Sequence, residues 1–197
     1  SQPGFDPNAF NKGLTNAYWR QLVDNEKSPL INKSIVGQYP PGSTFKMVVA
    51  LAALEAGVIT PDQSVFCNGV TELGNAKFHC WKKWGHGHMD MHGAIQQSCD
   101  VYFYEIAKRI GIDRIEAMAK RLGLGHSLDI DLPGERAGLI PSREWKLATR
   151  GESWQRGETL VAAIGQGFVL ATPLQLVTMA ARIVNGGRAV TPRLVRD

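Results

Sequence analysis

The residues best suited to chemistry are a serine and a lysine three positions apart. Ser43 and Lys46 stand at the start of an apolar run that extends from Met47 to Leu54. Residues with this spacing share one face of a helix, so the hydroxyl and the amine can act on each other. A lysine in a poorly solvated site loses its proton readily and can serve as a base, and a base beside a serine makes it a nucleophile. The pair favours nucleophilic catalysis by Ser43.

The same two residues also have a plain structural interpretation. Ser43 could cap the helix and Lys46 could be a solvated residue of its first turn, because the serine-x-x-lysine spacing is common by chance. Two features favour the catalytic interpretation: Pro-Pro-Gly at 40–42 ends the preceding segment, and the run behind the pair has no polar face. Such a helix is buried in a core, where unpaired polar groups are costly. We therefore expect Ser43 and Lys46 to open onto a cleft.

A second candidate motif lies in an expected loop between helices at 92–97 and 101–110. Ser98 and Asp100 offer a hydroxyl and a carboxylate two positions apart, a pair that can relay protons and orient a substrate amide. Taken alone, the motif is more simply a cap for the helix that begins at Asp100. Cys99, between the two, should point away from any cleft that its neighbours face.

The rest of the chain indicates one helix-rich domain with few strands. Apolar residues make up 44% of the 197, which is ample for a core. Thr172, Pro173 and Gln175 predict a capped helix that runs to about residue 184. We expect a single truncated domain over 1–197, with both ends cut from a longer protein and some strands of its sheet missing.

Charge and hydropathy exclude some classes of protein. The net charge is only +4, and the lysines and arginines are scattered without a polybasic run, which argues against a nucleic-acid partner. The longest apolar run, 47–54, is too short to span a bilayer, and no signal peptide is present. The basic surface could face an anionic polymer or a membrane surface.

The two motifs occur in the order used by serine acyltransferases that react with penicillin, whose signature is S-x-x-K, then S-x-N or S-x-D, then K-T-G. The sequence resembles the transpeptidase domain of the elongation-type class B penicillin-binding proteins. The resemblance implies the α+β fold shared by penicillin-binding proteins and serine β-lactamases, here with an incomplete sheet. The stretches that carry it span nearly the whole chain: 5–8, 39–46, 81–87, 139–145, 165–167 and 171–175.

The resemblance implies a D,D-transpeptidase that cross-links peptidoglycan stem peptides during cell elongation and maintains rod shape. Ser43 would attack the penultimate D-Ala carbonyl, and Lys46 would take its proton. Ser98 would pass a proton to the leaving amine, and Asp100 would orient the loop and the substrate. β-Lactams would acylate Ser43. The implied location is the periplasmic face of the bacterial inner membrane, with a membrane glycan polymerase and rod-shape scaffold proteins as partners.

One departure from the family's pattern matters. No Lys-Thr-Gly or Lys-Ser-Gly occurs in the sequence. In the family this motif lies on a strand after the region where this chain stops, and it helps to bind the substrate carboxylate and the oxyanion. We therefore expect a fragment whose activity on its own is in question. Two alternatives stay open: a non-catalytic penicillin-recognising sensor or scaffold domain, and a serine β-lactamase, which the insert at 81–87 disfavours.

Two of the three cysteines lie in the stretch 64–92, and Cys99 follows it in the second motif. We expect 64–92 to be an irregular insert, and a long irregular segment is usually functional or tied down by something. Cys67, Cys80, His86 and Cys99 could form a closed tetrahedral zinc site, which would pin the insert. Some members of the family hold zinc near this place, although the spacing is not a compact zinc-finger pattern. Alternatives are a Cys67–Cys80 disulfide with Cys99 free, or three unrelated core cysteines. The substitute fourth ligands would be two other histidines, His79 and His88.

The tryptophans of the insert have a simple interpretation as packing residues. Trp81 and Trp84 flank two lysines, and a role in gripping a substrate or a partner is the alternative.

Overall fold

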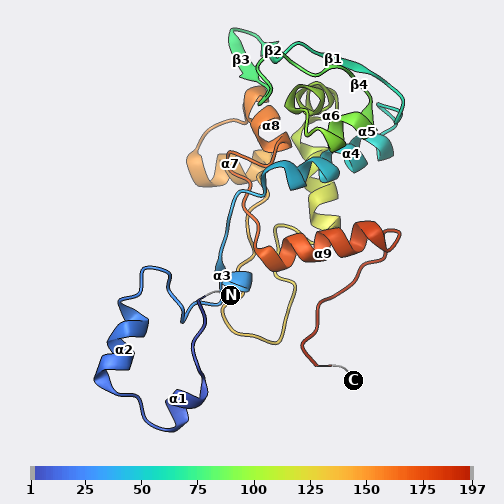
Figure 1. Ribbon diagram of the computed structural model, residues 1–197. Coiled ribbons are helices and arrows are strands. Elements are labelled where there is room, and N and C mark those ends of the chain that lie inside the picture. Colours follow the sequence, from blue (N-terminus) through green and yellow to red (C-terminus); the bar gives the residue numbers. More distant parts are fainter. Residues whose placement is uncertain (1–2, 196–197) are drawn as a thin grey trace.

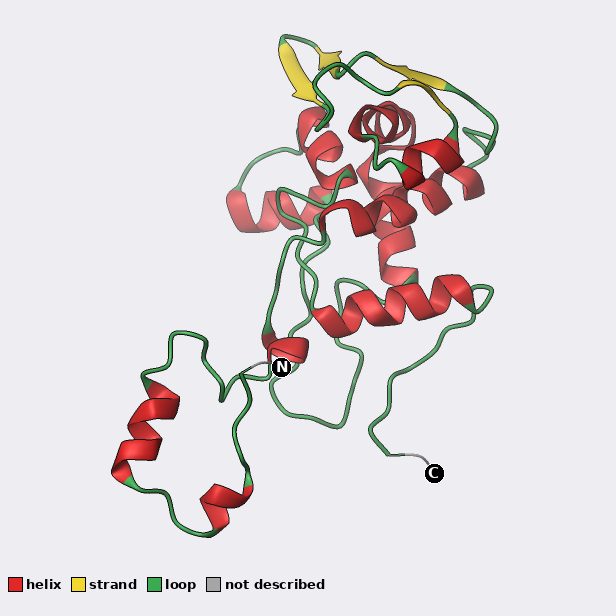
Figure 2. Ribbon diagram, viewed as in Figure 1, coloured by secondary structure: helices red, strands yellow, loops and turns green. Residues whose placement is uncertain are grey.

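The computed structural model describes residues 3–195, which form a helix-rich α+β structure (Figures 1 and 2). The described helices are α1 (Asn8–Asn11), α2 (Asn16–Val23), α3 (Lys33–Val36), α4 (Lys46–Glu55), α5 (Met91–Gln96), α6 (Asp100–Arg121), α7 (Arg143–Arg150), α8 (Arg156–Ala163) and α9 (Pro173–Val184), and a 3₁₀ turn at Gly42–Phe45 leads into α4. Within 3–195, no helix is both long and apolar enough to cross a membrane.

The core is built around α6, which packs against α4 on one side and α8 on another. The apolar run predicted to be a buried helix is α4, and Val48, Val49 and Ala53 are fully buried. Gly111 has φ +73° and interrupts the helical geometry of α6, where the sequence predicts a helix end. A residue without a side chain adopts this conformation without strain. The bend divides α6 into a first half, which opens with Asp100 of the second motif, and a second half, in which Ile112, Ile115 and Ala119 are buried in the core.

The stretch 64–92 is not irregular, and that prediction is wrong. β1 (Val65–Cys67) pairs antiparallel with β4 (Gly87–Met89), and β2 (Val70–Leu73) pairs antiparallel with β3 (Ala76–His79). Both small sheets lie over α6 on the side away from α9 (Figure 1). Strands of three or four residues are too short to show a clear alternation of apolar and polar residues, so the sequence pattern does not reveal them.

The segment that leads to Ser43 pairs with a segment from the second half of the chain. Tyr39 forms an antiparallel bridge with Ala171, and Leu139 forms one with Leu170. Immediately afterwards α9 begins with the predicted capping box: Thr172 Oγ1 accepts from Gln175 N, and Gln175 Oε1 accepts from Thr172 N. This arrangement fixes the 165–172 turn beside the start of α4.

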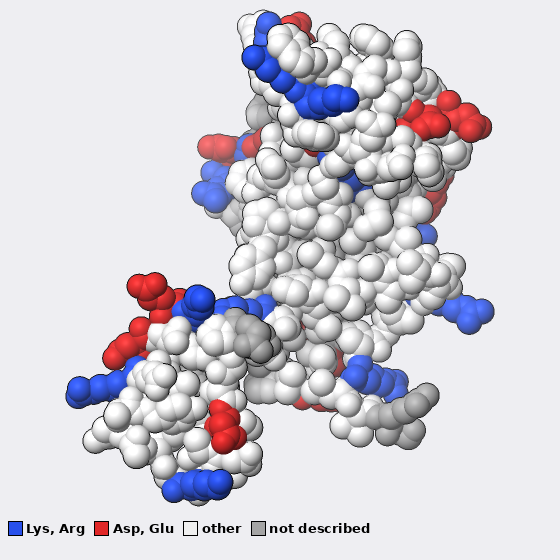
Figure 3. Space-filling model, viewed as in Figure 1, with Lys and Arg blue, Asp and Glu red and all other residues white. Residues whose placement is uncertain are grey.

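The first part of the chain stands apart from the helical body. Helices α1 and α2 lie on a lobe that extends away from the body (Figure 1). Thr15 caps α2 by accepting from Tyr18 N, at 3.2 Å. On the face shown in Figure 3, basic and acidic side chains gather in small separate groups, which agrees with the scattered charge of the sequence.

Candidate active site

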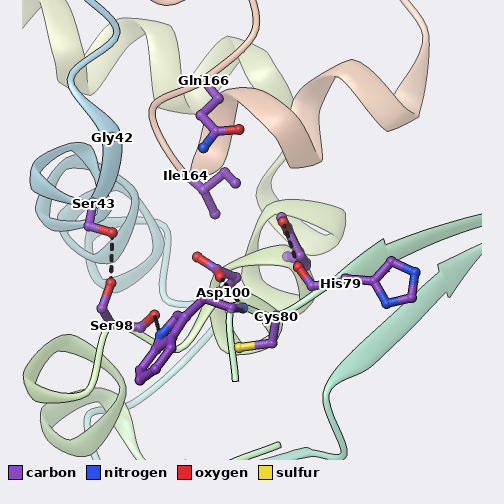
Figure 4. Close-up of a pocket in the computed structure, with 10 residues that line it drawn as sticks. Gly42, Ser43, His79, Cys80, Ser98, Asp100, Ile164 and Gln166 are labelled. Atoms are coloured by element: carbon purple, nitrogen blue, oxygen red, sulfur yellow. Dashed lines mark hydrogen bonds between the residues drawn. The ribbon is translucent and has the colours of Figure 1, made fainter. Parts of the chain in front are cut away.

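The Ser43 hydroxyl points at a second hydroxyl from a distant part of the chain. Ser43 lies in the 3₁₀ turn before α4, and its Oγ is 2.7 Å from Ser98 Oγ (Figure 4). The structure therefore does not use Ser43 as a helix cap. The side-chain hydrogen bond within this turn is made by Thr44, whose Oγ1 donates to Pro41 O. The two candidate motifs, 55 positions apart, meet through this hydrogen bond.

Lys46 is the first residue of α4, and its side chain is only 2% exposed. Its Nζ donates to Ser98 Oγ at 2.8 Å, to Ser98 O at 2.9 Å and to Asp100 Oδ1 at 2.6 Å. Three acceptors thus match the three N–H bonds of a lysine ammonium. The interpretation of Lys46 as a solvated first-turn residue is wrong. Its nearest hydroxyl partner is Ser98, so Ser43 is linked to Lys46 through Ser98.

The second motif is held in an unusual backbone conformation. Ser98 has φ +53°, in the left-handed region, and Asp100 opens α6. Ser98 and Asp100 both line the cleft, whereas Cys99 between them is fully buried. The prediction that Cys99 points away from the cleft is confirmed. Asp100 Oδ2 accepts from Trp81 N at 3.0 Å, so both oxygens of its carboxylate have partners.

The cleft in front of Ser43 has a volume of about 590 Å³. Its walls include residues that motif-based reasoning missed. His79, Ile164 and Gln166 are labelled in Figure 4, and Tyr104 also lines the cleft. Gly165 O accepts from Gly42 N at 2.9 Å, and a Cβ at Gly165 would lie 2.2 Å from Gly42 O. Only glycine permits this approach, so the Gly-Gln-Gly triplet at 165–167 is the sequence signal for this wall.

The predicted metal ligands come together beneath the second motif. The candidate ligand atoms of Cys67, Cys80, His86 and Cys99 all lie within 4.8 Å of one another, and all three cysteines are free. A Cys67–Cys80 disulfide is therefore absent. His88 is directed elsewhere, toward Ser64 Oγ at 3.5 Å. Strand β1 supplies Cys67, and α6 begins directly after Cys99, so this group ties the insert to the loop that carries Ser98.

The chemistry of this group fits a metal ion. His86 Nδ1 is 3.6 Å from Cys67 Sγ and 3.5 Å from Cys80 Sγ. In a tetrahedral zinc site, nitrogen and sulfur ligands lie about 3.6 Å apart. Burial, with the nearby Lys82, holds the pKa of His86 below its ordinary value, which favours the neutral imidazole that a metal requires. Burial raises the pKa of the Cys99 thiol far above its ordinary value, so its thiolate would need a cation beside it.

The two tryptophans of the insert are not packing residues. Trp81 is 65% exposed and lines the cleft, and Trp84 is 84% exposed. The packing interpretation assumed that large apolar side chains are buried, but Trp81 uses its polar atom instead. Its Nε1 donates to Ser98 O at 3.0 Å and to Gln97 O at 3.2 Å.

Comparison with known proteins agrees with the geometry. A family model described as the penicillin binding protein transpeptidase domain matches residues 1–197. The chain belongs to this family. The expected α+β fold is confirmed, as is the resemblance to its elongation-type class B members.

Individual relatives and solved structures support the same family. The chain is 40% identical to the peptidoglycan D,D-transpeptidase MrdA of Salmonella typhimurium over 197 residues, which is 99% of this chain and 32% of the relative. A Pseudomonas aeruginosa PBP2 solved in complex with WCK 5153 superposes with a TM-score of 0.96 at 45% identity, over 100% of this chain and 43% of that one. Helicobacter pylori PBP2 in complex with MreC gives 0.93 at 38% identity, over 98% and 36%. The chain thus spans about a third of the length of the curated relative.

Proposed function

We propose that the protein is a serine D,D-transpeptidase that cross-links peptidoglycan stem peptides during cell elongation. The observation that carries the proposal is the continuous hydrogen-bonded path from Ser43 through Ser98 to Lys46, with Asp100 behind it, at the base of the cleft. A nucleophile linked to a buried amine is the arrangement that acyl transfer requires. The family and the relatives support the same reaction.

Acylation follows this path. Lys46, an ammonium paired with Asp100 in the resting site, first releases a proton to water in the cleft. Ser43 Oγ then attacks the carbonyl carbon of the penultimate D-Ala, and its proton moves to Ser98 Oγ as the Ser98 proton moves to the neutral Lys46 Nζ. The ammonium that forms lies 2.6 Å from the Asp100 carboxylate, which stabilises its charge. When the tetrahedral intermediate collapses, the amide C–N bond breaks. Ser98 then gives its proton to the leaving D-Ala amine and is reprotonated by Lys46.

Cross-linking completes the reaction. The amine of a second stem peptide attacks the acyl-enzyme carbonyl, an amide bond forms, and the ester bond to Ser43 breaks. The amine's proton passes through Ser98 to Lys46, and Lys46 returns a proton through Ser98 to the leaving Ser43 Oγ, which restores the free enzyme. A β-lactam would enter through the first step alone, because its ring opens on Ser43 and the leaving nitrogen stays attached to the acyl group. The chain spans about a third of the length of its curated relative, so tests of activity use the full-length protein.

We also propose that Cys67, Cys80, His86 and Cys99 hold a structural zinc ion. Four ligands leave no open coordination position, as in structural zinc sites, so the ion would supply folding energy and would take no part in the reaction. The nitrogen–sulfur distances of 3.5 and 3.6 Å support this geometry.

The proposed setting is the periplasmic face of the bacterial inner membrane. Rod-shape scaffold proteins and a membrane glycan polymerase are the proposed partners. The solved complex of the H. pylori relative with MreC supports the first of these.

The test is the release of D-Ala and the formation of a cross-link by the full-length protein from a pair of stem peptides. We expect both products from the wild type and neither from Ser43→Ala. A protein that binds penicillin covalently without releasing D-Ala would be a sensor or scaffold. Rapid hydrolysis of a β-lactam would favour a β-lactamase. Either result would overturn the proposed function.

A further inference from the structure

Trp81 contacts both members of the second catalytic motif, although it belongs to neither motif. Its backbone N donates to Asp100 Oδ2 at 3.0 Å, and its indole Nε1 donates to Ser98 O at 3.0 Å. Lys46, on the first motif, also donates to both Ser98 and Asp100, through its side chain alone. The importance of these contacts rests on the proposed function.

Ser98 is the residue that most needs such support. It has φ +53°, a conformation that few residues other than glycine adopt and that persists only where the surroundings enforce it. Its carbonyl oxygen accepts two hydrogen bonds, one from Lys46 Nζ and one from Trp81 Nε1. These donors fix the plane of the Ser98 peptide. The same orientation places Ser98 Oγ 2.7 Å from Ser43 Oγ.

The position of Trp81 is not explained by burial, because 65% of the residue is exposed. Two neighbours hold it in place. Cys80 precedes it in the chain, and Cys80 N donates to Gly69 O at 2.8 Å. The His86 ring meets the indole edge to face, with the ring centroids 5.3 Å apart. Both Cys80 and His86 belong to the candidate metal group, so the placement of the indole depends on that group.

We propose that Trp81 is a positioning residue, which holds Ser98 and Asp100 in their reactive orientation and connects them to the Cys67–Cys80–His86–Cys99 group. Removing the indole N–H frees one side of the Ser98 carbonyl. The Ser98 hydroxyl then spends less time within hydrogen-bond distance of Ser43. The acylation step then slows because the Ser98 hydroxyl is less often in place to take the Ser43 proton.

The test uses Trp81→Phe in the full-length protein, which removes the indole donor and keeps the backbone N–H that contacts Asp100. We expect the first-order acylation rate constant for a penicillin to fall roughly tenfold, as is usual for one lost hydrogen bond in a positioned site. For the tryptophan analogue described below, which keeps the shape of the cleft wall, the dissociation constant of the initial complex should change by less than about twofold. Trp84→Phe is the matched control, because it is the same substitution at a neighbouring residue that is 84% exposed.

A second variant keeps the test decisive if Trp81→Phe does not fold. A tryptophan analogue with sulfur in place of the ring N–H, incorporated at position 81, keeps the shape of the indole and removes only the donor. We expect it to slow acylation as Trp81→Phe does. If either folded variant is acylated at the wild-type rate, the proposal is wrong. If Trp81→Phe fails to fold, the acylation rate of the protein with the analogue alone decides whether the proposal holds.

Hydrogen exchange separates this proposal from the proposed function. Peptides that cover 95–101 should exchange faster in both Trp81 variants than in the wild type, whereas peptides from α9 should not change. This result would support the positioning role even if the wild type were not acylated by penicillin, an outcome that would count against the transpeptidase proposal alone. Unchanged exchange at 95–101 would overturn the positioning role.

Discussion

At the scale of single residues, the ion pair between Lys46 and Asp100 is the most demanding feature of the site. The two side chains are 2% and 12% exposed, and their charged atoms lie 2.6 Å apart. Taking two charges out of water is costly, and the cost is recovered only when both are paired and hydrogen bonded. Here Nζ has three acceptors and each carboxylate oxygen has a donor, so the pair is fully satisfied.

Replacing Asp100 with Asn tests this ion pair. The substitution leaves the buried Lys46 ammonium without a counter-charge, and breaking a buried pair in this way costs about 3 to 5 kcal/mol. We expect the free energy of unfolding to fall by about 3 kcal/mol and acylation to slow by about 10². Chemical denaturation and penicillin-binding kinetics measure the two effects.

Glu116→Gln is the control for Asp100→Asn. It removes a carboxylate that pairs with Lys120 at 2.6 Å, but Lys120 is 53% exposed. A surface pair at this spacing contributes only about 0.3 to 0.5 kcal/mol. If both variants lost the same small amount of stability, the account of a buried catalytic ion pair would be wrong.

At the scale of elements, the turn at 127–135 shows how a loop is fixed without regular structure. Glu135 Oε1 accepts from Leu128 N at 2.7 Å, and Oε2 accepts from Ser127 Oγ at 2.6 Å and from Ile130 N at 3.3 Å. Partial burial raises the pKa of Glu135, but the hydrogen bonds from Ser127 and the backbone outweigh it and hold the pKa below its ordinary value of 4.5. The folded state therefore prefers the carboxylate.

The expected consequence is a pH dependence of stability. Because the folded-state pKa is lowered, the stabilisation by Glu135 is fully present above pH 4.5 and is lost as the pH falls through the lower folded-state value. The difference in unfolding free energy between wild type and Glu135→Gln should be largest near neutral pH and should shrink toward pH 3. Glu26→Gln, on the exposed lobe, controls for the change of charge. A difference that stayed constant with pH would contradict this account.

Elements also show how far sequence reasoning reaches. The apolar run gives α4, the glycine at 111 marks the bend in α6, and the Thr172–Gln175 box marks the start of α9. These signals are local, so the sequence displays them. The strands of 64–92 and the exposed positions of Trp81 and Trp84 depend on pairing with distant segments, and no local pattern predicts them.

Local sequence signals also predict the residues of the candidate site but not all of the contacts between them. All eight predicted side chains lie in two adjacent groups: Ser43, Lys46, Ser98 and Asp100 at the cleft, and Cys67, Cys80, His86 and Cys99 beneath it. What the sequence does not reveal is that Lys46 contacts Ser98 instead of Ser43, because this contact depends on the left-handed backbone of Ser98.

At the scale of the whole molecule, the metal group joins the small sheets to the helical core. β1 supplies Cys67, the segment between β3 and β4 supplies Cys80 and His86, and Cys99 precedes α6. If zinc binds here, its removal should loosen the sheets and the second motif together. We expect about one zinc ion per chain and, after chelation, a Tm lower by about 6 to 12 °C.

Elemental analysis and thermal unfolding of the full-length protein measure this effect. Cys67→Ser should reproduce the loss of metal, whereas His88→Ala, outside the group of four, should retain it. All three thiols should be recovered after unfolding. Metal-free protein with unchanged Tm, or only one free thiol, would show that the cysteines have another role.

The most direct test of the central claim is the site of covalent attachment of penicillin. The full-length protein is incubated with a labelled penicillin, digested, and mapped by mass spectrometry. We predict one acyl group per chain on the peptide that contains Ser43, and none on the Ser43→Ala variant, because Ser43 faces the cleft and is linked to Lys46 through Ser98. Attachment to Ser98 or another residue, or no attachment to a folded wild type, would contradict the assignment of Ser43 as the nucleophile.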